Sequence, residues 1–224
     1  MLLGRRRRAL AEAIGTAGLL CAIVGSGVMA ERLASGNAAV ALLANTIATA
    51  SALAALIAAL GPVSGAHLNP WVSVLAWRTR QLDPRELAAY VAAQITGAVA
   101  GVLLAHVMFD LPLFEISGHA RPGFSQTMAE AVATFGLLLV VGTVGRARPA
   151  AAPAAVACYI ASAYWFTSST SFANPAVTIA RSLTDTFAGI RPVDVPHFLA
   201  GQALGALAAF GVLPVLSPAT VQET

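Results

Sequence analysis

Charge is scarce in this sequence, and lysine is missing altogether. All 13 basic residues are arginine, and charged residues make up 10% of the 224 positions, against 58% hydrophobic residues. A soluble domain carries about 25% charged residues, so this chain lacks the polar surface that would coat a water-soluble globule. The composition therefore excludes an ordinary soluble domain and predicts an integral membrane protein.

Cysteine and the usual catalytic groupings are scarce too. The two cysteines, Cys21 and Cys158, each lie in an apolar run and share no metal-ligand spacing. Free cysteine in such a setting usually packs as a small hydrophobic residue. The sequence also has no nucleophile–base set and no cofactor-binding loop. We therefore expect no enzyme, no bound metal and no cofactor.

Long apolar runs are what the chain has instead. Six of them are long enough, or nearly so, to cross a hydrocarbon core of about 30 Å; they lie at 9–30, 38–60, 87–109, 127–145, 150–166 and 196–216. The first follows four arginines and resembles a signal peptide, but its length and Glu12 within its first turns indicate a retained span. Two further stretches, 67–77 and 172–182, are too short to span, and each contains Asn-Pro.

The arginines predict how the chain lies in the membrane, because basic residues favour the cytoplasmic side. With the N-terminus inside, nine fall on the cytoplasmic side: Arg5, Arg6, Arg7, Arg8, Arg78, Arg80, Arg85, Arg146 and Arg148. Four fall outside: Arg32, Arg121, Arg181 and Arg191. This split predicts a multi-pass protein of the cell (inner or plasma) membrane with both termini cytoplasmic.

Three landmarks occur twice in the same order. AEAIGT returns as AEAVAT, LNP returns as ANP, and QITGA returns as QALGA. The chain is thus one domain, 1–224, built from two repeats at about 9–109 and 127–216. Each repeat holds three spans, an odd number, so the second copy must enter the membrane inverted. Each repeat also has two glycines, four residues apart, in or next to the third landmark, and these are expected to let helices approach closely. They are Gly97, Gly101, Gly201 and Gly205.

Asn-Pro has a structural meaning at both of its positions. Asparagine is a favoured N-cap and proline is favoured at the first helical position, so each pair predicts the start of a half-helix. Inverted repeats with broken helices place their special site near the bilayer midplane. Two helix N-termini meeting there, each with about half a positive charge, would oppose cations. The asparagine N–H groups could still bind a neutral solute.

These features resemble the aquaporin, or major intrinsic protein, family. The motifs that carry the resemblance are SGAHLNP at 64–70 and ANPA at 173–176. The resemblance implies an all-α membrane protein with six transmembrane helices, two re-entrant half-helices, an hourglass pore in each subunit and a homotetramer. It places these residues at the pore midplane: Asn69, Pro70, Trp71, Asn174, Pro175 and Ala176. It also places His67 on the cytoplasmic half of the pore, and it gives a loop-bracing role to Glu12, Glu130, Gln94 and Gln202.

Two positions depart from the family pattern. Most members have an arginine directly after the second Asn-Pro-Ala, where this chain has Val177. The filter positions that the motifs suggest are Thr49, Ser162, Ser171 and Val177. This set is small and mildly polar, which predicts a wide, neutral filter for water, glycerol, urea, ammonia or neutral metalloid acids such as arsenous acid. The continuation of the second motif also resembles a bacterial subgroup linked to metalloid handling.

Two large side chains leave alternatives open. Arg181 lies four residues after Val177, on the same helical face, and could either replace the missing arginine or lie solvated at the outer interface. Trp71 stands where the family usually has alanine. It could point sideways into the protein or narrow the pore, since a residue this large would overpack the meeting of the half-helices.

Other functions compete with an open solute channel. A strict water channel is one. A coupled secondary transporter is another, although such proteins usually carry charges or ion-coordinating groups at their centre, and the clear intraspan carboxylates here have the bracing role. A structural homologue that conducts nothing is a further alternative, which Trp71 keeps open.

Overall fold

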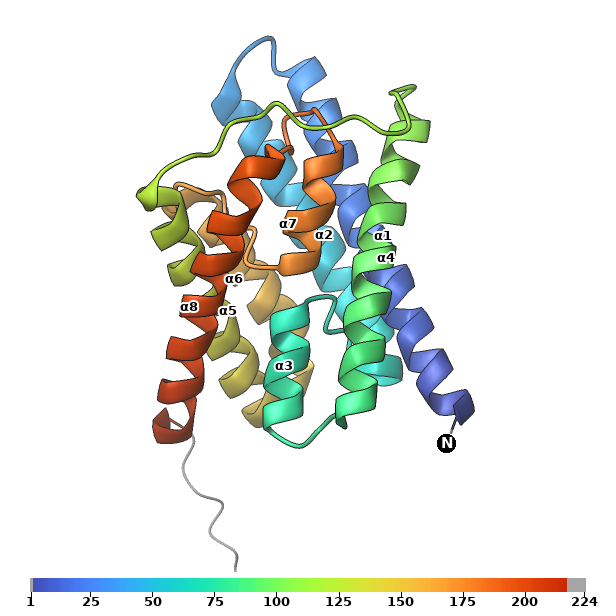
Figure 1. Ribbon diagram of the computed structural model, residues 1–224, viewed down its shortest axis with the longest axis vertical. Coiled ribbons are helices and arrows are strands. Elements are labelled where there is room, and N and C mark those ends of the chain that lie inside the picture. Colours follow the sequence, from blue (N-terminus) through green and yellow to red (C-terminus); the bar gives the residue numbers. More distant parts are fainter. Residues whose placement is uncertain (1, 217–224) are drawn as a thin grey trace, which may run out of the picture.

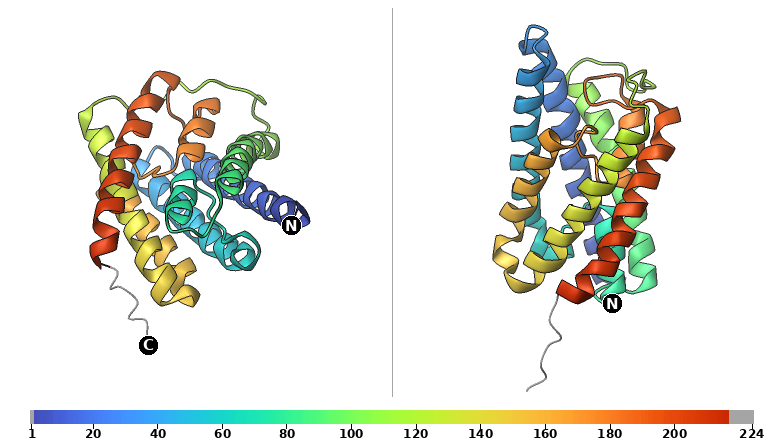
Figure 2. Two further views of the ribbon diagram at one scale, coloured as in Figure 1. Left: turned by 60° about the horizontal axis from the view of Figure 1, so that its bottom comes forward. Right: turned by 90° about the vertical axis from the view of Figure 1, so that its left-hand side faces the viewer.

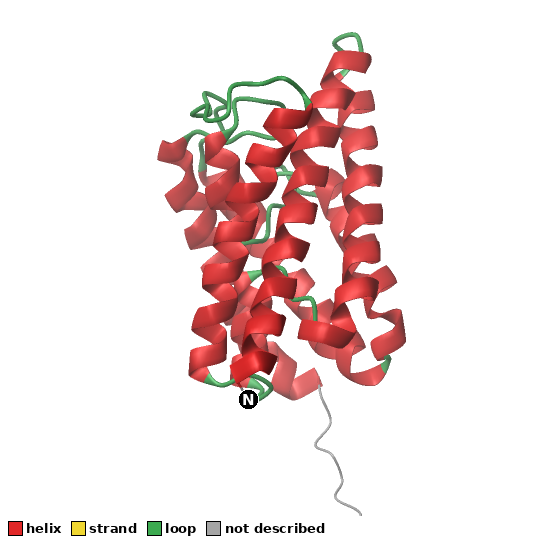
Figure 3. Ribbon diagram, turned by 90° about the vertical axis from the view of Figure 1, so that its right-hand side faces the viewer, coloured by secondary structure: helices red, strands yellow, loops and turns green. Residues whose placement is uncertain are grey.

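The computed structural model describes residues 2–216, and every regular element in that range is helical (Figures 1 and 3). The helices are α1 (Leu2–Leu33), α2 (Ala38–Ser64), α3 (Pro70–Arg78), α4 (Pro84–Met108), α5 (Phe124–Ala147), α6 (Ala152–Phe166), α7 (Pro175–Ala180) and α8 (Val195–Leu216). Three short 3₁₀ helices, η1 (Pro149–Ala151), η2 (Arg181–Leu183) and η3 (Pro192–Asp194), complete the set.

The predicted spans correspond to α1, α2, α4, α5, α6 and α8. Five of these are long and apolar enough to cross a membrane; α6, at 15 residues, is the short one. The N-terminal end of α1 begins several residues before the predicted span. Its extra turn carries Arg5 and Arg8, which pair with Asp83 and Glu86 at the start of α4. These ion pairs explain why the helix continues past its apolar part.

Local capping explains where several helices begin. The side chain of Asn37 accepts hydrogen bonds from the backbone N–H groups of Ala39 and Val40, which starts α2. Asp83 and Glu86 form a capping box at the start of α4. Such caps satisfy N–H groups that have no partner inside a helix.

The inverted repeat is visible in the arrangement of the short helices. In Figure 1, α3 lies in the lower half of the molecule and α7 in the upper half, and their first residues face each other near the middle. The N-terminus and the last turn of α8 lie at the same end, which we call the N-terminal end (Figures 1 and 2). The opposite end, which carries the 109–123 loop, is called the distal end.

Close helix pairs hold each repeat together, α1 on α4 in the first and α5 on α8 in the second. A Cβ atom added at any of four glycines would collide with a backbone carbonyl of the facing helix: Gly97, Gly101, Gly201 and Gly205. The prediction that these glycines permit close approach is confirmed. The same close glycine contacts in both repeats keep each helix pair narrow, and the two short helices lie between the pairs.

Candidate functional site

Both Asn-Pro pairs start a short helix. The Asn69 side chain accepts a hydrogen bond from the backbone N–H of Trp71 at 2.9 Å, and Pro70 is the first residue of α3. The Asn174 side chain accepts from Ala176 and Val177 at the start of α7. The predicted pair of half-helices is therefore confirmed, and in each the asparagine oxygen is used as the cap.

Each asparagine also ties its loop to the other loop. The amide nitrogen Nδ2 of Asn69 donates to the carbonyl oxygen of Ala173 at 2.8 Å, and Nδ2 of Asn174 donates to that of Leu68 at 2.7 Å. Leu68 and Ala173 both have positive φ, 50° and 48°. This conformation costs a non-glycine residue about 1–3 kcal/mol, and here it directs the two carbonyl groups across the centre of the molecule.

Glu12 lies under the first loop and is fully buried. Its carboxylate accepts four hydrogen bonds, from the backbone N–H groups of His67 and Leu68, the hydroxyl of Ser64 and the amide of Gln94, at 2.6–3.0 Å. A buried carboxylate is costly unless such donors surround it. With its acceptor positions filled, Glu12 holds the loop in place.

Glu130 has the same arrangement under the second loop and is also fully buried. It accepts from the backbone N–H groups of Phe172 and Ala173, the hydroxyl of Ser169 and the amide of Gln202, at 2.6–2.8 Å. The structure thus brings all four predicted bracing residues to the loops. Both loops are fixed from behind by a carboxylate that does not border the cavity described next.

Four hydroxyl groups also take part in this bracing and were not predicted from the sequence. Ser64 and Ser169 each lie five residues before the capping asparagine, and Ser73 and Thr178 lie four residues after it. The latter two contact the amides of Gln94 and Gln202, at 2.9 and 2.8 Å. The sequence did carry a signal for them, because a hydroxyl-bearing residue recurs at the same offset from the asparagine in both repeats.

A single cavity of ≈ 980 Å³ passes both asparagines. Its lining reaches from Arg181 at the distal end to Arg78 and Arg146 near the N-terminal end, with Asn69 and Asn174 between them. Pro70, Trp71, Pro175 and Ala176, which were predicted at the midplane with the asparagines, lie behind the lining. Both asparagines are almost buried, at 5% exposure, so a solute in the cavity meets only their tips.

His67 borders the cavity on the N-terminal side of Asn69. Its Nδ1 lies 3.1 Å from the hydroxyl of Ser73, and its ring centroid lies 5.2 Å from that of Tyr90. These contacts fix the imidazole against the wall of the cavity.

Three of the four predicted filter residues border the cavity: Thr49, Ser171 and Val177. All three are at most 3% exposed, and the hydroxyls of Thr49 and Ser171 have no hydrogen-bond partner among residues 2–216. A buried hydroxyl without a partner is costly, so both groups are available to a solute or to water.

The prediction for Ser162 is wrong. Its side chain is exposed on the outside of α6, and its hydroxyl donates to the carbonyl of Tyr159 on the same helix. Ile160 and Tyr164 border the cavity instead. These two are four residues apart and share a face, whereas Ser162 is rotated from either by about 200°, the angle that two residues span in an α-helix.

Trp71 points sideways, the first of the two alternatives. Its ring packs edge-on against Phe210 of α8, with 6.5 Å between ring centroids, and it joins an apolar cluster with Val72, Leu138 and Leu213. The indole N–H is buried and has no partner in the described part of the chain. The large side chain therefore fills the space between α3 and α8 and does not enter the cavity.

Arg181 is buried, at 3% exposure, and borders the cavity. The alternative of a solvated arginine at the interface is therefore wrong. Its Nε donates to the carbonyl of Ala188, and its Cζ lies 3.4 Å from the ring centroid of Phe172. A second arginine, Arg121 of the distal loop, lies over the same ring at 5.0 Å. Burial lowers the pKa of Arg121 to about 10, so that side chain stays charged at neutral pH.

Comparison with known proteins agrees with this geometry. The model of the major intrinsic protein family matches residues 3–169. The aquaglyceroporin AqpS of Rhizobium meliloti (strain 1021) is 50% identical over 214 residues, which are 95% of this chain and 91% of that protein. The probable aquaporin AqpM of Archaeoglobus fulgidus is 32% identical over 73% of this chain and 72% of its own length.

The fold has a counterpart among solved structures. The X-ray structure of the aquaglyceroporin from Plasmodium falciparum superposes with a TM-score of 0.71 and 21% sequence identity, covering 96% of this chain and 98% of that one. At this identity the likeness shows the shared fold alone.

Proposed function

The chain belongs to the major intrinsic protein family and is a channel for water and small solutes, and we propose that its pore passes uncharged solutes larger than water. Glycerol is the first candidate. The observation that carries the proposal is the cavity at Val177. An apolar side chain stands there beside two small hydroxyl residues, Thr49 and Ser171. A relative of 50% identity named as an aquaglyceroporin supports the same solute class.

The wall of the cavity suits neutral, hydrogen-bonding molecules. It offers the unpaired hydroxyls of Thr49 and Ser171 next to the apolar Ile160 and Val177. Such a mixture can take the hydroxyl groups of a polyol on one side and its carbon chain on the other. Urea, ammonia and neutral metalloid acids such as arsenous acid belong to the same class and are further candidates.

A proton-coupled transporter finds less support. The carboxylates of Glu12 and Glu130 are each surrounded by four neutral donors and do not border the cavity. A coupling site would need a charge that a moving ion can reach. We therefore keep both carboxylates as braces of the loops.

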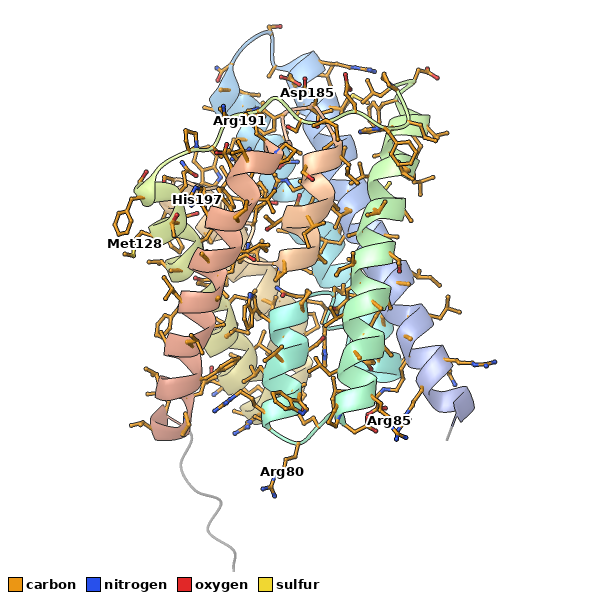
Figure 4. All side chains as sticks on the ribbon, viewed as in Figure 1. Arg80, Arg85, Met128, Asp185, Arg191 and His197 are labelled. Carbon is orange, nitrogen blue, oxygen red and sulfur yellow. The ribbon has the colours of Figure 1, made fainter. Side chains whose placement is uncertain are left out.

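We further propose that the N-terminal end faces the cytoplasm of a cell membrane and that four copies assemble. Arg80 and Arg85 extend from that end in Figure 4, on the same side as the N-terminus. Basic residues favour the cytoplasmic side. The tetramer is an expectation from the family, and crosslinking in membranes would test it.

Glycerol entry into proteoliposomes tests the function. Vesicles with the purified protein are mixed with hyperosmotic glycerol and followed by light scattering. We expect fast shrinkage followed by fast re-swelling, and Val177→Arg, which narrows the cavity, should slow the re-swelling more than the shrinkage. Val193→Arg, at an exposed position on η3, is the control. Shrinkage without re-swelling in the unmodified protein would contradict a wide filter.

A further inference from the structure

Resting on the proposed function, we propose that Arg181 excludes cations at the distal mouth of this pore, in addition to the two half-helix N-termini at its centre, and binds the oxygen atoms of passing solutes. The position directly after the second Asn-Pro-Ala holds valine, so the charge there is missing. Arg181 lies one helical turn further toward the distal end. Side chains of a helix lean toward its N-terminus, which brings the long arginine back toward the level of Val177.

Two contacts hold the guanidinium at the cavity wall. Its Nε donates to the carbonyl of Ala188, and its Cζ lies over the ring of Phe172, 3.4 Å from the ring centroid. Phe172 is itself fixed, because its backbone N–H donates to Glu130 at 2.8 Å. The ring attracts the cation by its quadrupole. The side chain is therefore preorganised by the second loop instead of extending freely into water.

The remaining donors of Arg181 are free for a solute. Guanidinium carries five N–H donors, and the only hydrogen bond that the Arg181 side chain donates within residues 2–216 is the one from Nε. A buried charged group with unused donors is costly unless a ligand or water fills them. Because Arg181 borders the cavity, its free terminal N–H groups can donate to the oxygen atoms of a solute, such as those of a polyol or of urea.

The charge of Arg181 is not neutralised by a neighbour. Among the described residues, the ion pairs involve Arg5, Arg8 and Arg191 and leave Arg181 without a carboxylate. The nearest titratable group on the same ring is Arg121, which has the same sign. Arg121 is occupied with loop carbonyls, among them Gly189 at 2.8 Å. Two positive charges, those of Arg181 and Arg121, thus lie over the Phe172 ring at the distal mouth. In this poorly solvated setting their repulsion of a cation is strong.

The distal mouth is therefore a site with three chemical faces. Arg181 offers N–H donors, Thr49 and Ser171 offer hydroxyls that can donate or accept, and Val177 offers an apolar surface. The solute class that matches all three is small, uncharged, and carries at least two oxygen or nitrogen groups on a short carbon frame. A cation finds oxygen atoms only at the two hydroxyls and is repelled by the charge of Arg181.

The sodium and proton leak of proteoliposomes tests the assignment. We expect Arg181→Gln to raise the leak about tenfold or more, the scale expected when a nearby like charge is removed from a poorly solvated path. A single elution peak in detergent and a water flux above that of empty vesicles show that the variant is folded and its pore open. Arg32→Gln is the control, because Arg32 is also at the distal end but contacts Phe109 and does not border the cavity. An unchanged leak in a folded Arg181→Gln protein would overturn the proposal.

A second variant separates charge from packing. Arg181→Lys keeps the positive charge and loses the contact of the guanidinium with the Phe172 ring, so its leak should stay near that of the unmodified protein. The uncharged Arg181→Gln is measured beside it. A leak through a folded Arg181→Lys protein as high as that through Arg181→Gln would overturn the role of the charge. Failure of the proposed function looks different: the unmodified protein would then pass no glycerol, whatever its leak.

Discussion

Two groups of buried polar residues decide how this channel works. In one group every polar side-chain atom is hydrogen-bonded within the protein, and in the other some polar atoms have no partner in the protein. Glu12 and Glu130 have every carboxylate lone pair directed at a donor of the protein. Thr49, Ser171 and the terminal nitrogens of Arg181 have none within the described residues and border the cavity. The first group holds the loops, and the second is left for the solute.

The bracing role of Glu130 predicts a loss of stability when it is changed. In Glu130→Gln, one oxygen that accepts two hydrogen bonds becomes an NH₂ group facing other donors. Each buried donor left without a partner costs about 1–3 kcal/mol, so the melting temperature in detergent should fall clearly. Glu31→Gln, at an exposed position, is the control. A Glu130→Gln protein with the same melting temperature as the unmodified protein would contradict the bracing role of Glu130.

Trp71 gives a second prediction at this scale. Because its ring packs on Phe210 outside the cavity, Trp71→Ala should lower the free energy of unfolding without faster water flux. The ring is only partly buried, so the expected loss is about 2 kcal/mol, roughly half the cost of deleting a fully buried aromatic side chain. Thermal unfolding and stopped-flow water permeability check the two parts. A large gain in water flux would mean that Trp71 obstructs the pore.

At the scale of helices, close contacts at glycine residues determine how near the helices that form the pore wall lie to one another. Gly205 meets the carbonyl of Ala131, whereas Gly211, on the same helix, has no atom within 4 Å of an added Cβ. Gly205→Ala should therefore separate α5 from α8 and reduce the yield of folded protein. Gly211→Ala, the matched control, should be neutral or gain up to about 1 kcal/mol from helix propensity. Monodisperse yield in detergent measures both, and equal yields would contradict the account.

The helices are also where prediction from sequence succeeded and where it ended. Apolar length and the Asn-Pro caps are local signals, so the six spans and the starts of α3 and α7 could be read without a structure. Ser162 could not be placed, because the face of α6 that meets the cavity depends on its packing against α2 and α5. Likewise, the burial of Arg181 depends on Ala188 and Phe172, which approach it only through the folding of the distal loops.

At the scale of the whole molecule, the two repeats make matching contacts at the two asparagines but line the rest of the pore with different residues. Both loops are braced alike and exchange hydrogen bonds from Asn69 and Asn174. The cavity is lined by the buried Arg181 in the distal half and by His67, Arg78 and Arg146 in the other half. The selective step is therefore expected at the distal mouth, on the side away from the termini.

Water, glycerol and proton flux recorded together in one preparation of proteoliposomes would show whether the pore is both wide for neutral solutes and closed to cations. The account predicts water and glycerol fluxes well above those of empty vesicles, together with a proton flux no higher than theirs. Glycerol entry at the rate of empty vesicles, or a proton flux that rises with the amount of protein, would contradict a pore that is wide for neutral solutes and closed to cations.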